Sequence, residues 1–137
     1  MRKVLQAASA ATSGSLAGAM LVIRVVLVPA WRQAATTDFK PWFVTNAPRL
    51  RSVMLPLGVA SVATTTLNAL VTRRGRPIVG AAAAAGVVAI TTTVNEPLNA
   101  RFEGPDPVDP ADLERWSRWH DVRVALGFVS ALACTTP

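Results

Sequence analysis

The residues best suited to chemistry lie in two short segments, "NEPLN" at positions 95–99 and "WSRWHDVRV" at positions 116–124. The second segment contains His120, the only histidine of the chain, together with Arg123 and two of the four tryptophans. An imidazole can act as a general base near neutral pH. A guanidinium can stabilise a developing oxyanion. We therefore expect His120 and Arg123 to be catalytic residues.

Helical spacing places the polar residues of the first segment on one face. Thr91, Asn95 and Asn99 follow one another four residues apart, so they line one side of a helix. Pro97 has no N–H to donate to the carbonyl of Thr93, so the helix should kink or loosen there. A freed carbonyl and two amides would form a hydrogen-bonding pocket at the membrane edge.

The second segment forms a stripe of its own. Trp116, His120, Arg123 and Gly127 lie on one helix face, and Trp119 flanks Arg123. The tryptophans could stack on an aromatic ligand, or they could belong to the aromatic belt of a membrane interface. Arg123 could also reach the interface along its own aliphatic stem. The spacing alone leaves these interpretations open.

The composition is that of a membrane protein. The 137 residues suffice for one domain, 51% of them are hydrophobic, 16% are charged, and the mean hydropathy is +0.36. The formal net charge of +6 does not indicate nucleic-acid binding, because most arginines lie at the ends of apolar runs, where membrane proteins carry them. A single cysteine, Cys134, excludes an internal disulfide and any Cys-rich metal site. No spacing motif supports a metal or a cofactor, and we expect neither.

Four stretches approach the ~20 residues that a transmembrane helix needs. They are residues 7–30, 54–72, 77–99 and 116–134, the last of which must recruit its Trp-rich opening to span. Backbone polar groups in lipid must be satisfied within the segment, so these spans should be helices. The sequence therefore predicts an all-α fold, an integral membrane four-helix bundle that forms a single domain over residues 1–137.

The segments between the spans are predicted to be loops. "FKPWF" at 39–43 should lie at the headgroup level after the first helix. "RFEGPDPVDPADLER" at 101–115 is acidic and proline-rich, and should form an ordered cap or a flexible lid. The Gly-x-x-x-Gly spacing of Gly14 and Gly18 predicts tight helix packing within the bundle.

The charges at the ends of the spans bear on orientation. The compact "TRRGR" turn at 72–76 favours a cytoplasmic location for that side, and hence for both termini, whereas a plain count of Lys and Arg favours the opposite side. A signal peptide would explain "MRK" followed by an apolar core, but Arg24 interrupts that core, and we expect an uncleaved N-terminus. We expect the protein in the bacterial inner (cytoplasmic) membrane.

Chain direction brings the polar residues to one end of the bundle. Alternating spans would place the end of the first helix, the end of the third and the start of the fourth side by side. Ionisable groups inside a membrane are costly and usually mark a site. The residues concerned are Arg24, Asn95, Glu96, Asn99, His120, Asp121 and Arg123. A structural Arg24–Glu96 ion pair is the simpler alternative for those two residues.

These two motifs resemble a known family. An Asn-x-Pro-x-Asn motif that closes a helix, followed by an aromatic pair, a histidine and an arginine, is similar to the anthrone oxygenase-like membrane proteins, a family long described as a domain of unknown function. The four-span layout and a first helix that ends near Pro29 match as well. Glu96 stands where many members have an apolar residue, and Asp121 stands where some place the histidine. The positions carried over are Asn95, Pro97, Asn99, Trp116, Trp119, His120 and Arg123.

The resemblance implies a membrane-embedded oxygenase or oxidoreductase that acts on a hydrophobic aromatic small molecule, such as a phenol, an anthrone or a quinone. An anthrone carbanion can pass electrons to oxygen without metal or flavin, so the protein would supply a base, His120, and an oxyanion cradle around Arg123. We expect the substrate to be bound by Asn95, Asn99, Trp116, Trp119, Arg24 and Glu96.

A function without catalysis stays open. The chain could be an accessory or packing subunit of a membrane complex, or a lipid-binding envelope protein. Its Gly/Ala-rich faces would then serve the helices of a partner or of a second copy, and the polar cluster would be structural. Genes for aromatic polyketides nearby would favour the enzyme, and copurification in a stoichiometric complex would favour the subunit.

Overall fold

The structure, a computed structural model, describes residues 1–135 as four long helical segments. No strand occurs within that range. The first segment joins α1 (Arg2–Val22), η1 (Ile23–Leu27) and α2 (Val28–Gln33), and the second is α3 (Thr36–Thr72). The third joins α4 (Gly75–Ile90), η2 (Thr91–Asn95) and α5 (Glu96–Glu103), and the fourth is α6 (Pro110–Thr135).

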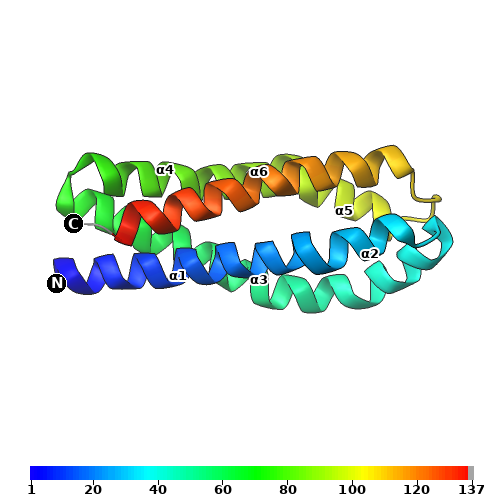
Figure 1. The fold of residues 1–137 in the computed structure, drawn as a ribbon, viewed down its shortest axis with the longest axis horizontal. Helices are drawn as coiled ribbons and strands as arrows, with labels where there is room; N and C mark the ends of the chain where they lie inside the picture. The colour runs from blue at the N-terminus through cyan, green and yellow to red at the C-terminus, as the bar shows by residue number, and fades with distance from the viewer. Residues whose placement is uncertain (136–137) are drawn as a thin grey trace.

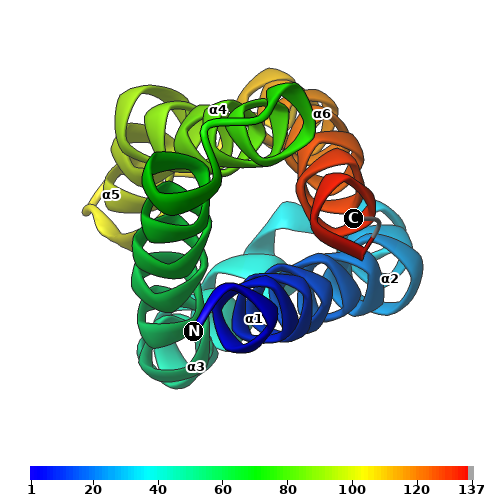
Figure 2. The ribbon, with the colours of Figure 1, turned by 90° about the vertical axis from the view of Figure 1, so that its left-hand side faces the viewer.

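The four segments form an up-down-up-down bundle, with the chain start and the end of α6 at the same end (Figure 1). Viewed along its length, the bundle is a square in which α1 lies between α3 and α6, and α4 completes the fourth corner (Figure 2). Every neighbouring pair is antiparallel. As predicted, the end of the first segment, the end of the third and the start of α6 meet at one end.

The second helix is much longer than the sequence predicted. Residues 36–53, expected to include a loop, are the first half of α3, which contains three prolines. Pro41, Pro48 and Pro56 are spaced by about two helical turns and are all exposed, so the carbonyls they leave unpaired face outward. The opposite face buries Phe39 and Phe43. The prediction of a loop at 39–43 was wrong, because a helix with its prolines on one outer face buries the aromatic rings on the other.

An aromatic core fills the end of the bundle where this extension lies. Phe39 and Phe43 belong to this core and are 1% and 3% exposed, while their location at the headgroup level stays a prediction. The rings of Phe39 and Phe102 meet edge to face with centroids 5.4 Å apart, and Trp31 meets Trp116 at the same centroid distance. Each such pair contributes about 0.5–1.5 kcal/mol beyond burial. This core fixes α5 and the start of α6 against α2 and α3.

The connection between α5 and α6 is short and tied down. It covers residues 104–109, because both flanking helices extend into the predicted acidic loop. The ammonium of Lys40 donates to the carbonyls of Gly104 and Asp106. The loop therefore acts as an ordered cap on α3.

The half of the bundle near the termini is joined by small polar residues. The hydroxyls of Ser13 and Ser61 are 2.9 Å apart, and the hydroxyl of Ser130 donates to Ser13 and to the carbonyl of Gly80. These residues come from all four helical segments. Interhelical hydrogen bonds of this kind hold helices together where no hydrophobic drive is available between them.

The first and the third segment each contain a single wide turn just before a proline. η1 ends two residues before Pro29, and η2 ends two residues before Pro97. A proline cannot donate to the carbonyl four residues earlier, and the helix instead closes an i to i+5 bond, from the N–H of Glu96 to the carbonyl of Thr91 in the second case. The predicted loosening at Pro97 is confirmed.

The close approach between helices is at Gly127, not at the Gly-x-x-x-Gly motif. A Cβ at Gly14 or Gly18 would meet no atom within 4 Å, so the packing predicted for that motif was wrong. At Gly127 a Cβ would lie 2.7 Å from Cε of Met20 and 3.3 Å from Cα of Ala17. The missing side chain therefore allows α1 and α6 to touch.

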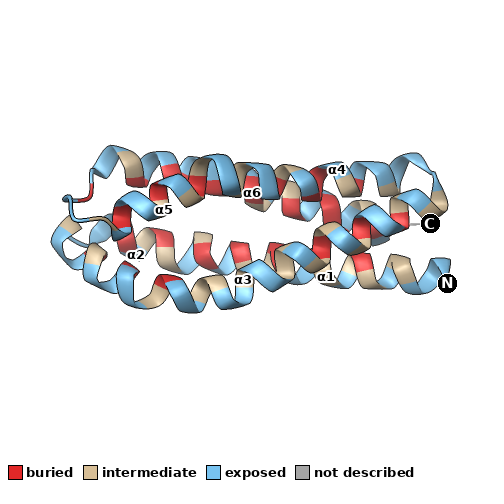
Figure 3. Cartoon of the chain, turned by 180° about the vertical axis from the view of Figure 1, so that it is seen from behind, coloured by how far each residue is buried: buried red, intermediate tan, exposed pale blue. Residues whose placement is uncertain are grey.

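Three segments, residues 2–33, 36–72 and 75–103, are long and apolar enough to cross a membrane. Burial is confined to their inner faces, and the outer surface is exposed (Figure 3). Leu55, Leu67 and Leu70 of α3 are at least half exposed. With 37 residues, α3 is about 55 Å long and exceeds the ~30 Å hydrocarbon core. α3 is therefore too long to lie entirely within the apolar layer.

We expect Gly127→Ala to lower the free energy of unfolding by about 1 kcal/mol, because the new methyl group displaces the end of the Met20 side chain and lies 3.3 Å from Cα of Ala17, so that α1 has to shift slightly. Unfolding in detergent, followed by circular dichroism during titration with sodium dodecyl sulfate, measures the change. The matched control is Gly14→Ala, which should be neutral or stabilise by up to about 1 kcal/mol through helix propensity. Equal effects of the two substitutions would contradict a close contact at Gly127.

Candidate functional site

The centre of the candidate site is the Arg123 guanidinium, which is 8% exposed. One terminal nitrogen donates to the hydroxyl of Thr91 at 3.0 Å, and the other lies 2.6 Å from Nδ1 of His120. The buried Nε–H has no partner in the described chain. None of the described carboxylates forms an ion pair with this cation. Burying a cation that has no direct ion-pair partner costs free energy of folding. Arg123 is therefore the least expected of the side chains in the interior of the bundle.

His120 fixes that guanidinium in place. The imidazole is fully buried, and its Nε2 lies 2.9 Å from the carbonyl of Met20 in α1. A carbonyl only accepts, so Nε2 carries the proton and Nδ1 offers its lone pair to Arg123. Both ring nitrogens are therefore engaged, and the imidazole connects α1 to the arginine of α6.

Trp116 packs against both residues and carries the contact on to α5. Its ring is stacked on the imidazole with centroids 4.8 Å apart, and the carbon of the Arg123 guanidinium lies 5.6 Å from the ring centroid. The indole N–H donates to Oδ1 of Asn99 at 2.8 Å. The amide of Asn95 donates to the backbone carbonyl of Trp116 at 3.3 Å. The two asparagines thus position the tryptophan, and the tryptophan positions the cation.

A charged rim lies on the side of the site that faces the loops. Glu96 accepts from the amide of Asn99 at 2.8 Å and lies 3.4 Å from Nε of Arg51. Arg51 also binds Glu103 at 2.7 Å. This network joins α3 to α5 across the end of the bundle.

A cavity of about 600 Å³ lies beside the guanidinium. Polar side chains on its wall are those of Arg51, Thr91, Thr92, Glu96, Asn99 and Arg123. The remaining lining is almost entirely apolar and includes Met20, Ile23, Trp31, Phe43, Met54 and Trp116. Such a space suits a planar aromatic molecule whose polar oxygen reaches Arg123.

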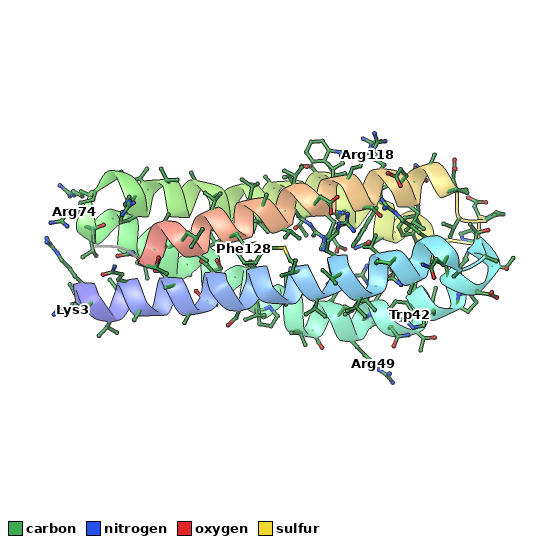
Figure 4. All side chains as sticks on the ribbon, viewed as in Figure 1. Lys3, Trp42, Arg49, Arg74, Arg118 and Phe128 are labelled. Carbon is green, nitrogen blue, oxygen red and sulfur yellow. The ribbon has the colours of Figure 1, made fainter. Side chains whose placement is uncertain are left out.

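The structure brings together six of the eight predicted site residues. Asn95, Asn99, Glu96, Trp116, His120 and Arg123 form one connected cluster, although His120 and Asn95 do not line the cavity. Arg24 instead forms an ion pair with Asp121 outside the cavity, so the Arg24–Glu96 pairing is not formed. Trp119 is 38% exposed and also lies away from the cavity. Arg118, one residue earlier, points outward as well (Figure 4).

Two further features belong to the site and were not assigned to it from the sequence. Thr91 was placed on the correct helix face, but its hydroxyl was not expected to accept from Arg123. Arg51 was taken only as a charge at a membrane edge. Phe43, Ala47 and Arg51 follow one another at intervals of four residues. In a continuous helix this spacing would have placed Arg51 on the same inner face as Phe43 and Ala47.

The family model described as anthrone oxygenase matches residues 39–133. The chain belongs to the anthrone oxygenase family. The match includes both motifs of the site and three of the four helical segments. No curated protein and no solved structure matches the chain. Membership in the family is thus shown, while the reaction and the substrate have to be argued from the site.

The described residues contain no group of three His, Cys, Asp or Glu side chains that could hold a metal ion. His120, the best metal ligand available, has both nitrogens in hydrogen bonds. The polar groups on the cavity wall include the guanidinium groups of Arg51 and Arg123, threonine hydroxyls, the Asn99 amide and the Glu96 carboxylate. This set is suited to binding an organic oxyanion and to moving a proton.

Arg123→Met should raise the free energy of unfolding, or leave it unchanged, because replacing a lone buried cation with an apolar side chain of similar volume removes a desolvation cost of several kcal/mol. The measurement is the same detergent unfolding titration. The matched control is the exposed Arg49→Met, which should change stability by less than about 0.5 kcal/mol. A clear loss of stability in Arg123→Met would show that the guanidinium serves the fold rather than a ligand.

Proposed function

We propose that this protein is a membrane-embedded oxidoreductase of the anthrone oxygenase type, acting on a hydrophobic anthrone or a related phenolic or quinone-like molecule. The observation that carries the proposal is the Arg123 guanidinium, which is buried, forms no direct ion pair with a described carboxylate and faces a largely apolar cavity of about 600 Å³. An anionic oxygen on a flat apolar ligand would neutralise the cation and fill the space. Family membership supports the same class of ligand.

The proposed reaction needs no group that the chain lacks except O₂. Loss of a proton from the ring methylene opposite the carbonyl gives an enolate, whose oxygen is stabilised by Arg123. The carbanion form passes an electron to O₂, and recombination forms a carbon–oxygen bond and a hydroperoxide. Loss of the second methylene proton with cleavage of the O–O bond gives the quinone carbonyl and water. One anthrone and one O₂ thus become one anthraquinone and one water.

His120 is proposed to position Arg123, which departs from the base role expected from the sequence. Its Nε2–H is committed to Met20, its Nδ1 to Arg123, and no part of the ring lines the cavity. Glu96 does line the cavity and carries a carboxylate held by Asn99. We assign the proton-accepting role to Glu96.

The same proposal includes four membrane spans. α6 runs alongside the other three segments over most of the length of the bundle (Figure 1). Its outer face exposes Phe128, Val129 and Leu132, and its charged residues point inward or lie near the predicted membrane edge. A bilayer that surrounds the other segments would therefore surround α6 as well. A location in the bacterial inner membrane, with both termini cytoplasmic, remains part of the proposal.

Oxidation of a dihydroxyanthrone by the protein in lipid nanodiscs tests the function. We expect one molecule of O₂ to be consumed for each molecule of anthraquinone formed. Both rates should exceed those measured with empty nanodiscs. Arg123→Lys should lower kcat/KM by about 10²-fold, because the three donors of an ammonium share one nitrogen and cannot reproduce the planar fork whose separate nitrogens reach Thr91 and His120. A wild-type rate equal to that of empty nanodiscs would overturn the activity.

A second set of variants separates the two roles considered for His120. Asparagine places an oxygen near the position of Nδ1 and can still accept from Arg123. The kcat/KM of His120→Asn should therefore stay within about tenfold of the wild-type value. The kcat/KM of His120→Leu should fall by as much as that of Arg123→Lys. A loss of ~10² to 10⁴ in kcat with His120→Asn, at unchanged protein level, would restore the base role. If His120 is the base, Glu96→Gln should have nearly the wild-type kcat. If Glu96 accepts the proton, as proposed, Glu96→Gln should have a strongly reduced kcat.

A further inference from the structure

The cavity beside Arg123 reaches the outer surface of the bundle. Its wall on one side consists of residues of α3 and of the α4–η2 segment that are themselves exposed. Leu55 and Val59 of α3 are 68% and 62% exposed, and Val88 of α4 is 38% exposed. All three belong to segments apolar enough to lie in the membrane.

The other sides of the cavity are closed. α1 and α6 contribute buried residues such as Leu16, Met20 and Trp116. On the side facing the loops, Arg51 bridges α3 to α5 through its bonds to Glu96 and Glu103. The remaining opening is therefore the apolar one between α3 and the α4–η2 segment.

Gly58 lies at this opening, between Leu55 and Val59 on the lining of the cavity. A Cβ at Gly58 would meet no atom within 4 Å. The position therefore has no packing reason to be glycine, and a large side chain there would occupy the opening without displacing backbone.

We propose that the cavity opens sideways into the bilayer at Gly58, and that the ligand enters from the lipid phase with its ionisable oxygen leading towards Arg123. The identity of the ligand rests on the proposed function, whereas the opening does not. A ligand seated in this way leaves its far edge among acyl chains. A charged group on that edge would have to be buried in hydrocarbon, at a cost of several kcal/mol. The site therefore selects neutral, lipid-soluble molecules with one polar edge.

Quenching by lipid tests the opening without any substrate. In a Trp42→Phe/Trp119→Phe background the remaining tryptophans, Trp31 and Trp116, both line the cavity. Nanodiscs of phosphatidylcholine with brominated acyl chains should quench their fluorescence. Gly58→Phe should reduce that quenching about twofold, because the opening is then filled. The matched control is Gly14→Phe, another glycine in open space but away from the cavity, which should change nothing. Equal quenching in all three proteins would overturn the opening.

Binding kinetics of alizarin, a neutral dihydroxyanthraquinone, test the route. Gly58→Phe should slow association and dissociation by about tenfold each, with Kd changed less than about threefold. Alizarin sulfonate, which carries a fixed charge, should bind at least about tenfold more weakly than alizarin. If Arg51→Ala speeds association while Gly58→Phe leaves it unchanged, the ligand enters from the headgroup side and the lipid route is overturned. Lipid quenching as expected, with no binding of alizarin, would sustain the opening and refute the proposed ligand class.

Discussion

The burial of one arginine is the constraint around which this end of the bundle is arranged. Moving the guanidinium of Arg123 out of water is costly, and the groups in direct contact with it are neutral: a threonine hydroxyl, an imidazole nitrogen and the face of an indole, while the charge of Glu96 attracts it at longer range. Each of these groups needs its own support. The imidazole is held by the carbonyl of Met20 in the first segment, and the indole is held by Asn99 in the third. The ion pair of Glu96 with Arg51 adds the second segment. The hydrogen bonds and ion pairs around Arg123 therefore join all four helical segments.

The two wide turns give this arrangement its space. η1 and η2 lie on diagonally opposite segments, each two residues before a proline, and the cavity is lined by residues of both. A regular helix would place Thr91 at a different angle and would narrow the gap between the segments. The two prolines therefore interrupt the regular hydrogen bonding of their helices at the level of the cavity. Elsewhere in the bundle, the hydrogen-bonded serines and the close contact of α1 with α6 at Gly127 keep the helices tightly packed. Single wide turns of this type are frequent at functional sites.

Spacing and chain direction were sufficient to predict the cluster itself. Asn95 and Asn99 four residues apart, and Trp116, His120 and Arg123 on one stripe, follow from helical geometry alone. What could not be predicted depends on tertiary contact. Whether Arg24 meets Glu96 or Asp121 is decided by a helix rotation of a fraction of a turn. The availability of His120 as a base depends on which groups its two nitrogens find. The proline-containing first half of α3 was missed because local propensity opposed a helix that buried aromatic rings stabilise.

A buried cation with no direct ion pair has a further consequence for the proposed chemistry, in a cavity that is proposed to open to lipid. Phenols and anthrones dissolve in hydrocarbon only as neutral molecules, and there they have no tendency to ionise, because nothing stabilises the anion. Beside Arg123 the anion gains a partner that was already desolvated, so the cost of burying the cation is recovered only when the ligand loses its proton. Neutral ligand binds without that gain. The interaction is therefore stronger in the ionised, oxygen-reactive state than in the ground state, which is the condition for binding energy to accelerate a reaction.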